Sequence, residues 1–420
     1  MIIVNIILSV TFCGSGRIWP HAGSGVVWSY GGSQGNAMQD EARKMKILHV
    51  LGGLNRGGAE TWLMHVLRHI DRDRFQFDFL VHTEKKCAYD DEARELGARI
   101  IPNPDPSNPF LYAANFIRNY RKYGPYDVVH SHVHHYSGFV LFLAKTCGVP
   151  KRIAHSHNDT RPAESGAGVW RRTYLKVMER FIRIFATSGV AASRKAAEAL
   201  YGANWENDMR WSVLYCGIDL EEFTGNDDIE EIKNELGLPI CSSIIGHVGS
   251  FVETKNHSFL IDIAEEVFRR LPNSYLLLVG DGALRKEIEM KVREKGMEER
   301  VIFTGVREDI PRLMRAMDVF VMPSLYEGLP VVLIEAQASR VPCVISDSIT
   351  AEADIIREMV CGIGLREPPT FWAEKVMELR GRKVDCSKGI CLQAIRESPF
   401  NIENSVRALC SLYCDENINS

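Results

Sequence analysis

Two glutamates eight positions apart, Glu327 and Glu335, have the residue types and the spacing to bind a polar ligand. Glu327 lies in a turn rich in glycine and proline, and Glu335 lies in the apolar segment that follows. This segment is expected to form a helix that begins at Pro330, because proline at the first helical position loses no hydrogen bond. The backbone N–H groups of Gly328 and Leu329 at this helix start could bind an anion. Glu327 would reach the far end of that ligand, and Glu335 would accept hydrogen bonds from paired hydroxyls such as those of a ribose.

Two further loops could contribute to an anion site. The loop GGLNRGGAE, residues 52–60, lies between an expected strand and an expected helix, and its glycines would let the backbone approach a ligand. Glu60 would repel a phosphate if its side chain pointed inward. Lys255 follows the strand-ending Gly249 by six residues and precedes a helix, so its ammonium group could neutralise a diphosphate. A tight turn and a surface lysine are the alternative interpretations.

Histidines follow two of the expected strands. His130, His132, His134 and His135 fall within six positions, but no nearby carboxylate pair or cysteine completes a metal-ligand set, so we expect no metal there. His157 lies just past its strand, where an imidazole could hydrogen-bond a substrate hydroxyl. The alternative is that the ring only forms hydrogen bonds within the protein at the end of its strand.

The composition is that of an ordinary globular protein. The chain has 420 residues, 45% hydrophobic and 25% charged, enough for two or three domains. Its net charge of −4 gives no reason to expect a nucleic acid partner. Its eleven cysteines include no pair with the spacing of a zinc site, so we expect reduced thiols in a cytoplasmic protein.

The first 44 residues differ from the rest of the chain. The apolar start MIIVNIILSVTF is too short to span a bilayer and lacks the basic residues of a signal peptide, and a stretch rich in glycine and serine follows. We expect Met45 to be the natural start and residues 1–44 to be a poorly ordered leader. A membrane-associated leader is the alternative, and the N-terminal mass of the native protein would decide between them.

From Met45 onward, short apolar runs alternate with amphipathic segments, which indicates parallel sheets with helices on both faces. We expect an α/β fold with two Rossmann-like domains, residues 45–222 and 223–395, and a C-terminal helix within 396–420 that packs back on the first domain. Ligands bind beyond the carboxyl ends of such strands, so the site should lie in a cleft between the domains. The expected strands are residues 47–51, 77–81, 127–130, 152–155, 189–192 and 212–215, then 242–249, 274–280, 300–305, 318–323 and 342–346.

The chain resembles the retaining glycosyltransferases of family 4, also described as glycosyl transferases group 1, which have the two-domain GT-B fold. Bacterial exopolysaccharide and capsule sugar transferases are similar to it. The resemblance extends from Met45 to about Ala408 and includes the E-x7-E pair of Glu327 and Glu335. The other motifs that carry it are GGAE (57–60), HSHND (155–159), LYCGIDLEEF (214–223), VGSF (248–251), KNH (255–257), VGDG (279–282) and FTGVREDI (303–310).

The resemblance implies catalytic and binding roles for the matching residues. Gly57 and Gly58 would approach the donor diphosphate, and Lys255 would contact its phosphates. His157 would lie near a hydroxyl of the donor sugar, with its backbone carbonyl facing the reacting carbon. Glu327 would hold the donor sugar. His157, Glu327 and Lys255 are therefore the expected catalytic residues.

The remaining matches complete the expected nucleotide site. Gly328 and Leu329 would supply backbone N–H groups, Glu335 would bind the ribose, and Val306 would lie beside the base.

Ser250 departs from the family pattern, because the family commonly has an arginine at this position. The donor diphosphate would then meet one cation fewer from this loop. Either Lys255 and the helix start suffice, or Arg307 or another residue takes the place of the arginine.

The resemblance implies transfer of a sugar from a nucleoside diphosphate to an acceptor hydroxyl with the anomeric configuration retained. The expected acceptor is a polysaccharide or lipid-linked glycan precursor. We expect no cofactor and no metal, since no Asp-x-Asp pair lies in a suitable loop. Neither glutamate is assigned as a nucleophile. The alternatives are a nucleotide-sugar epimerase of related fold and a sugar-nucleotide-binding protein that has lost catalysis.

The segment 169–186 is expected to form a helix with a basic face and an apolar face. Such a helix could touch an anionic bilayer or a lipid-diphosphate acceptor, with the protein lying peripherally at the inner face of the membrane. An ordinary solvated face of a core helix is the alternative. The basic residues are Arg172, Lys176, Arg180 and Arg183, and the apolar residues are Trp170, Tyr174, Val177, Phe181 and Phe185.

Overall fold

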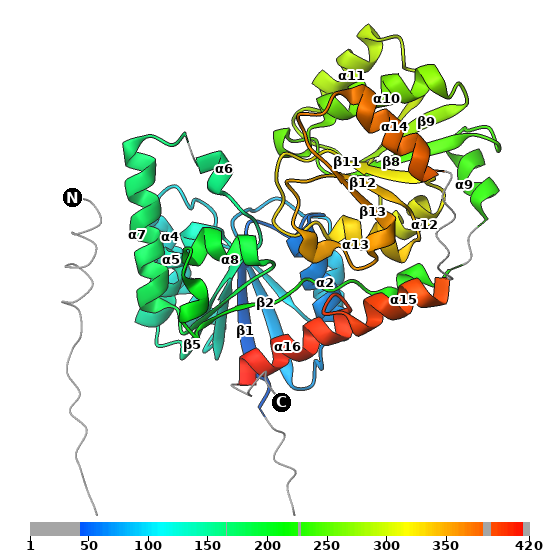
Figure 1. The fold of residues 1–420 in the computed structure, drawn as a ribbon. Coiled ribbons are helices and arrows are strands. Elements are labelled where there is room, and N and C mark those ends of the chain that lie inside the picture. The colour runs from blue at the N-terminus through cyan, green and yellow to red at the C-terminus, as the bar shows by residue number, and fades with distance from the viewer. Residues whose placement is uncertain (1–42, 165, 226–227, 381–387, 415–420) are drawn as a thin grey trace, which may run out of the picture. The chain divides into compact units, whose positions relative to one another are not determined.

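Two parallel β-sheets form the core of the computed structural model, which describes residues 43–164, 166–225, 228–380 and 388–414 (Figure 1). The expected leader falls outside these residues except for Arg43 and Lys44. Among the described residues, no helix has both the length and the apolar character that crossing a bilayer requires.

The first sheet has seven strands in the order β3-β2-β1-β4-β5-β6-β7, with every neighbouring pair parallel. The strand order reverses between β1 and β4, so the loops after these two strands open into a crevice at the carboxyl edge. The strands are β1 (Met45–Leu51), β2 (Phe75–Val81), β3 (Arg99–Pro102), β4 (Val128–Ser131), β5 (Lys151–Ser156), β6 (Ser188–Ala191) and β7 (Trp211–Val213).

Helices cover both faces of the first sheet, and apolar side chains fill the space between each helix layer and the strands. One face carries α2 (Gly58–His69) and α3 (Asp90–Glu95). The other face carries α4 (Pro109–Tyr123), α5 (Ser137–Thr146), α7 (Val169–Phe185) and α8 (Arg194–Tyr201), with the short α6 (Arg161–Glu164) before α7.

The second sheet has six parallel strands in the order β10-β9-β8-β11-β12-β13, and its order reverses between β8 and β11. Its faces are covered by α9, α12, α13 and α15 on one side and by α10, α11 and α14 on the other. The strands are β8 (Ser243–Val248), β9 (Ser274–Val279), β10 (Val301–Gly305), β11 (Val319–Met322), β12 (Cys343–Ser346) and β13 (Val360–Ile363). The helices are α9 (Ile229–Glu235), α10 (His257–Arg270), α11 (Arg285–Glu294), α12 (Ile310–Arg315), α13 (Val331–Ala338), α14 (Pro369–Arg380) and α15 (Lys388–Glu397).

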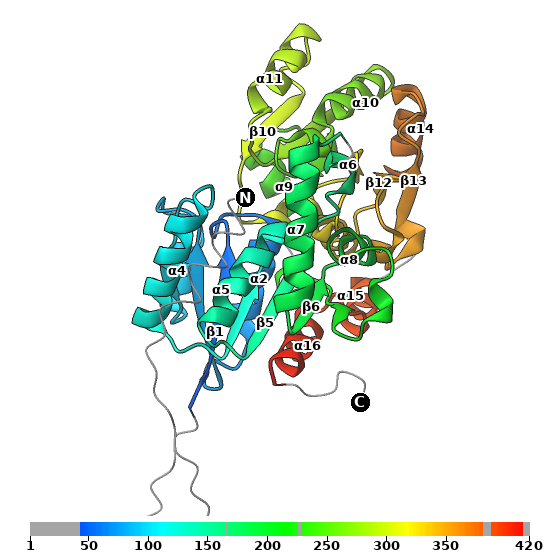
Figure 2. The same ribbon diagram turned by 90° about the vertical axis from the view of Figure 1, so that its left-hand side faces the viewer.

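The last helix, α16 (Ile402–Cys414), returns to the first sheet and packs beside α2 (Figures 1 and 2). The indole Nε1 of Trp62 on α2 donates to Ser405 Oγ at 2.8 Å, and Leu409 and Tyr413 are buried in the core of that face. The C-terminal segment therefore completes the core of the first half of the chain.

The expected fold class and all the expected strands are confirmed, but the sequence did not reveal β3 and β13. Both are four-residue strands at the edge of a sheet, and their partly exposed residues give neither alternation nor a continuous apolar run. The expected start of α13 was also wrong. Pro330 is the N-cap residue with ψ 87°, outside the helical region, and the helix begins at Val331.

Candidate active site

A cleft of about 770 Å³ lies at the carboxyl edges of both sheets, within the size range of small-molecule sites. The loops after β1, β5, β8, β10 and β11 line it. Most of the residues expected from the sequence line this cleft: Gly57, Gly58, His157, Ser250, Lys255, Val306, Glu327, Leu329 and Glu335.

Gly328 is the expected residue that does not line the cleft. It is buried where the two halves touch, and a Cβ atom at this position would lie 2.1 Å from the backbone oxygen of His157. Its own carbonyl accepts a hydrogen bond from Ser193 Oγ at 2.9 Å. Only glycine therefore allows the backbone before α13 to lie against the backbone after β5.

The loops after β8 and β11 place Lys255 and Glu327 side by side. The amide of Leu325 donates to the oxygen of Thr254 at 2.7 Å, and Asn256 Nδ2 donates to the oxygen of Pro323 at 3.1 Å. Asn256 adopts the left-handed φ of 54° that ends the short turn holding Lys255. As a result, the Lys255 ammonium donates to Glu327 Oε1 at 2.7 Å. The sequence gave no indication that these two residues would pair.

The start of α13 leaves one backbone donor, the Leu329 amide, beside the cleft. Within the described ranges, the N–H groups of Gly328 and Leu329 have no hydrogen-bond partner, whereas Val331 N–H donates to the oxygen of Leu329 at 3.0 Å. Leu329 lines the cleft beside Glu327. An anion at this position would meet an open amide, the positive end of the helix dipole and the nearby Lys255 ammonium.

Glu335 lies on the cleft side of α13, deep enough for its protonation to change. Burial raises its pKa from 4.5 to about 7, and the charge of Glu222 contributes to the same shift. In the described part of the chain, its carboxylate has no hydrogen-bond partner. An unpaired carboxylate in such a place is costly for the fold and well suited to accept hydrogen bonds from a ligand.

The loop after β1 contributes a charged residue that sequence reasoning missed. Arg56 lines the cleft, its guanidinium lies over the Tyr89 ring, and it forms an ion pair with Glu308 from the opposite half. Its place directly before the glycine pair in NRGGAE was the available signal. Glu60, in the same loop, also lines the cleft, and burial raises its pKa.

Arg307 was the residue expected to replace the arginine missing at Ser250, but carboxylates outside the cleft lining hold its guanidinium. Arg307 donates to Asp309 at 2.7 Å and to Glu235 at 2.8 Å, and these contacts raise its pKa. Arg56 is therefore the better-placed second cation beside Lys255.

His157 reaches the cleft from the end of β5 and belongs to a group of close histidines. Its Nε2 lies 2.9 Å from Nδ1 of His132, which also lines the cleft. Burial lowers the pKa of His157 to about 3, so the ring is neutral at pH 7. His134 and His135 lie apart from this group, on the short 3-10 turn that follows β4.

Three groups among the described residues bring metal-ligand atoms within 4.8 Å of one another. Two are histidine triads that share His132, namely His49, His130 and His132, and His132, His155 and His157. His132 hydrogen-bonds one other member of each triad, and His130 hydrogen-bonds His155 of the other triad. The third combines His65, Asp219 and Glu222 at the edge of the cleft. The expectation that the reaction needs no metal stays a prediction.

The partly buried carboxyl of Glu335, whose pKa is raised, predicts a pH-dependent stability. The folded protein binds this proton more tightly than the unfolded chain does, so the stabilisation is fully present below about pH 4.5 and is lost as pH rises through 7. Glu335→Gln carries no charge at any pH. Its thermal midpoint should exceed that of the wild type by roughly 2–4 °C at about pH 8.5 and by much less at about pH 5.5.

Thermal denaturation across this pH range measures the effect, with Glu367→Gln as the control that removes a carboxylate from an exposed position. A gap between Glu335→Gln and the wild type that did not grow with pH would contradict the buried state of this carboxyl.

Two family descriptions match the chain, one in each half. Residues 56–222 match Glycosyltransferase Family 4, and residues 242–381 match Glycosyl transferases group 1. Among curated proteins, a putative glycosyltransferase, EpsF, of Bacillus subtilis (strain 168) is 40% identical over 373 residues, which cover 88% of this chain and 96% of EpsF. A UDP-Gal:alpha-D-GlcNAc-diphosphoundecaprenol alpha-1,3-galactosyltransferase of Escherichia coli is 27% identical over 70% of this chain and 76% of its own length.

Solved structures share the fold. The crystal structure of Anabaena HepE in complex with UDP-glucose superposes with a TM-score of 0.73 at 21% identity, over 88% of this chain and all of that one. A glycosyltransferase involved in lipopolysaccharide biosynthesis, WaaG, superposes with a TM-score of 0.63 at 17% identity, over 88% of this chain and 98% of WaaG. The chain has the two-domain GT-B fold with a cleft between its halves, and EpsF is 40% identical to it over nearly the full length of both proteins. This chain therefore belongs to glycosyltransferase family 4.

Proposed function

We propose that this glycosyltransferase takes a sugar from a nucleoside diphosphate and transfers it to an acceptor hydroxyl with retention of the anomeric configuration. The observation that carries the proposal is the pairing of Lys255 with Glu327 at the open start of α13. A diphosphate placed there would meet the ammonium group and the Leu329 amide, and Glu335 would reach a ribose. The base would then lie toward the exposed Val306.

The proposed reaction uses charge stabilisation rather than a protein nucleophile. The glycosidic carbon–oxygen bond breaks, and the electron pair stays on the departing diphosphate, which Lys255 and the α13 start stabilise. The acceptor hydroxyl attacks from the same face and gives its proton to that phosphate oxygen. When Lys255 turns to the phosphate, Glu327 becomes available to hold hydroxyls of the donor sugar.

Similar proteins support a polysaccharide or lipid-linked glycan precursor as the acceptor. The Escherichia coli relative acts on a diphosphoundecaprenol-linked sugar by its name, and a capsular polysaccharide biosynthesis glycosyltransferase of Staphylococcus aureus is 26% identical over 81% of this chain and 92% of its own length. HepE has been crystallised with UDP and glucose. We therefore propose a nucleoside diphosphate sugar as the donor and a growing, membrane-linked glycan as the acceptor.

The first test replaces Lys255 by alanine. Losing one charge-stabilising donor should lower the turnover number roughly a hundredfold or more, while far-UV circular dichroism stays unchanged. Transfer from a panel of UDP and GDP sugars to a lipid extract measures the rate, and NMR of the product reports the anomeric configuration. The control is Lys286→Ala, which removes an exposed lysine of α11. Near-normal transfer by Lys255→Ala, or an inverted product, would contradict the proposal, and binding without any transfer would indicate a protein that only holds the nucleotide.

The second test adds one methyl group at Gly328. Its Cβ would overlap the backbone oxygen of His157, so the two halves must move apart and the donor must lose groups from one side. We expect Gly328→Ala to lower kcat/KM roughly a hundredfold. The control is Gly362→Ala on β13, where a Cβ meets no atom within 4 Å. Wild-type kinetics in Gly328→Ala would show that the contact between the halves is unnecessary for transfer.

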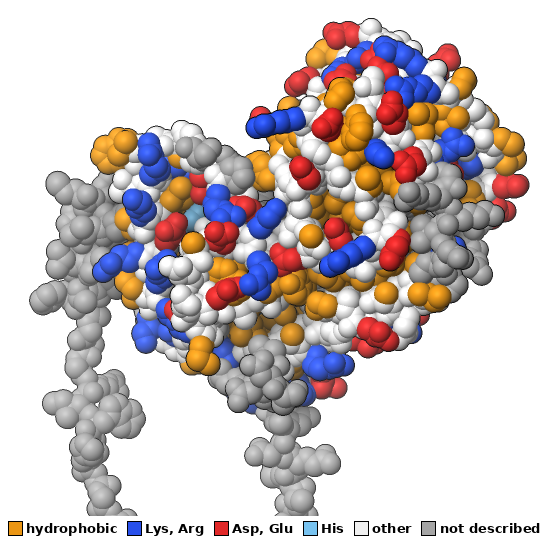
Figure 3. Space-filling view, in the orientation of Figure 1, with side chains coloured by type: hydrophobic (Ala, Val, Ile, Leu, Met, Phe, Trp, Pro, Cys, Tyr) orange, Lys and Arg blue, Asp and Glu red, His pale blue; other side chains and the backbone are white. Residues whose placement is uncertain are grey.

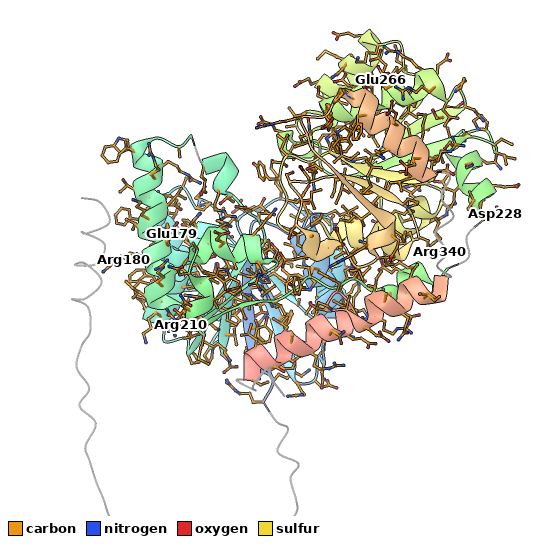
Figure 4. All side chains as sticks on the ribbon, viewed as in Figure 1. Glu179, Arg180, Arg210, Asp228, Glu266 and Arg340 are labelled. Atoms are coloured by element: carbon orange, nitrogen blue, oxygen red, sulfur yellow. The ribbon has the colours of Figure 1, made fainter. Side chains whose placement is uncertain are left out.

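The helix α7 supports a peripheral contact with an anionic membrane. Val169 and Trp170 at its start are 71% and 89% exposed, and Figure 3 shows hydrophobic side chains at this end of the helix. Trp170 therefore does not pack with the apolar face as expected, although the other four apolar residues of that face do lie on the core. The exposed Arg180 extends away from the helix, with Glu179 beside it (Figure 4).

Liposome co-sedimentation tests this contact. Replacing Trp170 by serine, together with Arg172→Gln and Lys176→Gln, should reduce the bound fraction on vesicles with anionic lipid several-fold, since each basic residue contributes about 1 kcal/mol near such a surface. The control carries Arg293→Gln and Lys286→Gln on the exposed side of α11. If the α7 variant binds the vesicles as well as the wild type does, this surface of α7 does not contact the membrane.

A further inference from the structure

Six polar side chains, four buried and two half-buried, form one hydrogen-bonded line that runs from the cleft to the C-terminal helix and back into the first sheet. Five are imidazoles at the ends of β1, β4 and β5, and the sixth is the phenol of Tyr413 on α16. The links are His157 Nε2 to His132 Nδ1 (2.9 Å), His132 Nε2 to His49 Nδ1 (3.0 Å), His49 Nε2 to Tyr413 Oη (3.5 Å), Tyr413 Oη to His130 Nδ1 (2.9 Å) and His130 Nε2 to His155 Nδ1 (3.2 Å).

All five rings are neutral at pH 7, because burial lowers the pKa of each of them. A neutral imidazole has one N–H group and one lone pair. Each link therefore needs an N–H on one side and a lone pair on the other, and the tautomer of one ring determines the tautomer of the next. The whole line can adopt only two arrangements, one the reverse of the other.

The Tyr413 hydroxyl determines which of the two arrangements of N–H groups and lone pairs the line adopts. Its hydroxyl has one proton and two lone pairs and lies between two imidazoles. Accepting from both would leave its buried O–H unpaired, which is costly, so it donates to one imidazole and accepts from the other. A phenol O–H makes a short bond, and the shorter of its two contacts is the one to His130 Nδ1. Tyr413 then accepts from His49 Nε2–H.

The rest of the line follows from that choice. His49 Nδ1 accepts from His132 Nε2–H, and His132 Nδ1 accepts from His157 Nε2–H. The proton of His157 is thereby fixed on Nε2, and its Nδ1 keeps a lone pair for a ligand in the cleft.

We propose that Tyr413 is a positioning residue for the transfer reaction, which holds His157 in the Nε2–H tautomer through His49 and His132 so that Nδ1 accepts a hydrogen bond from a hydroxyl of the donor sugar. The proposal rests on the proposed function for the identity of the ligand. The tautomer of His157 does not depend on the proposed function, because the protein's own hydrogen bonds determine it.

A metal ion is the competing occupant of this histidine group. Two triads within the line bring three ring nitrogens within 4.8 Å of one another. A metal needs lone pairs that converge on one point, whereas the nitrogens between His157 and His49 face each other at hydrogen-bonding distance. The hydrogen-bonded line uses these nitrogens fully, and a metal would have to break it.

The test uses the whole chain labelled with ¹⁵N-histidine, in which nitrogen chemical shifts separate N–H, lone-pair and metal-bound nitrogens. In the wild type, His157, assigned with His157→Gln, should show a protonated Nε2 and an unprotonated Nδ1. Tyr413→Phe removes only the hydroxyl, so His157 should become a mixture of both tautomers. The kcat of Tyr413→Phe should fall as the fraction of the Nε2–H tautomer falls, roughly two- to tenfold, with little change in KM.

Tyr201→Phe is the matched control, because it removes another buried phenol hydroxyl near the same sheet. That hydroxyl contacts the backbone oxygens of Ala154 and Val190 and no histidine. It should affect stability but leave the His157 shifts unchanged.

Three results would overturn the proposal: a wild-type His157 protonated on Nδ1, His157 shifts in Tyr413→Phe that equal those of the wild type, or one equivalent of bound metal with metal-shifted histidine nitrogens. The protein could transfer sugar from no donor while the His157 shifts in Tyr413→Phe still change as expected. In that case the proposed function is wrong, but Tyr413 does fix the tautomer of His157.

Discussion

The contact between Gly328 and the backbone of His157 is the constraint on which the cleft depends. No side chain fits between these two backbone segments, and the bond from Ser193 Oγ to the Gly328 carbonyl holds them together. The contact fixes the start of α13, from the second half, at a constant distance from the end of β5, from the first half. Side chains from two separate sheets can therefore face one small ligand with the accuracy that transfer chemistry needs.

Further hydrogen bonds join the two halves. The amide of Arg194 donates to Glu352, Lys195 Nζ donates to the oxygen of Ser348 at 2.8 Å, and the Tyr215 hydroxyl donates to Glu352 at 2.9 Å. The ion pair of Arg56 with Glu308 also joins the halves, through a largely exposed carboxylate. Such a pair contributes little to stability in water and can be replaced by a ligand.

Carboxylates pair with two cations of the cleft. Arg56 pairs with Glu308, and Lys255 pairs with Glu327. A ligand that offers only hydroxyl groups would have to break these pairs without replacing the negative charge, which is unfavourable in a partly buried place. A diphosphate supplies that charge itself and frees Glu327 for hydroxyl groups. This exchange gives a physical reason for preferring a nucleoside diphosphate sugar over a free sugar.

The sequence predicts the parts of this protein that local pattern controls. Alternation of apolar runs with amphipathic segments predicted both sheets, and the loop positions of Lys255, Glu327 and His157 predicted that they would share a cleft. The pairing of Lys255 with Glu327 could not be predicted, because it depends on two loops 72 positions apart in sequence that bond to each other only in the folded protein. The buried contact of Gly328 was missed for a similar reason, since the segment that excludes its side chain comes from the other sheet.

The histidines show most clearly why the chain must be folded before its chemistry can be understood. In sequence, His130 and His132 stood in a run that resembled an incomplete metal site, and His49 and His155 had no assigned role. In the structure they lie where a core would ordinarily be apolar, and burying so many polar rings would be costly if their nitrogens were unpaired. The parallel pairing of β1, β4 and β5 brings the rings close enough to pair most of these nitrogens with one another, although the buried His155 Nε2 has no hydrogen-bond partner among the described residues. The line still needs a group that can both donate and accept between its two branches, and only the return of α16 to the first sheet supplies one. The C-terminal helix is therefore part of the site's polar interior as well as of its apolar core.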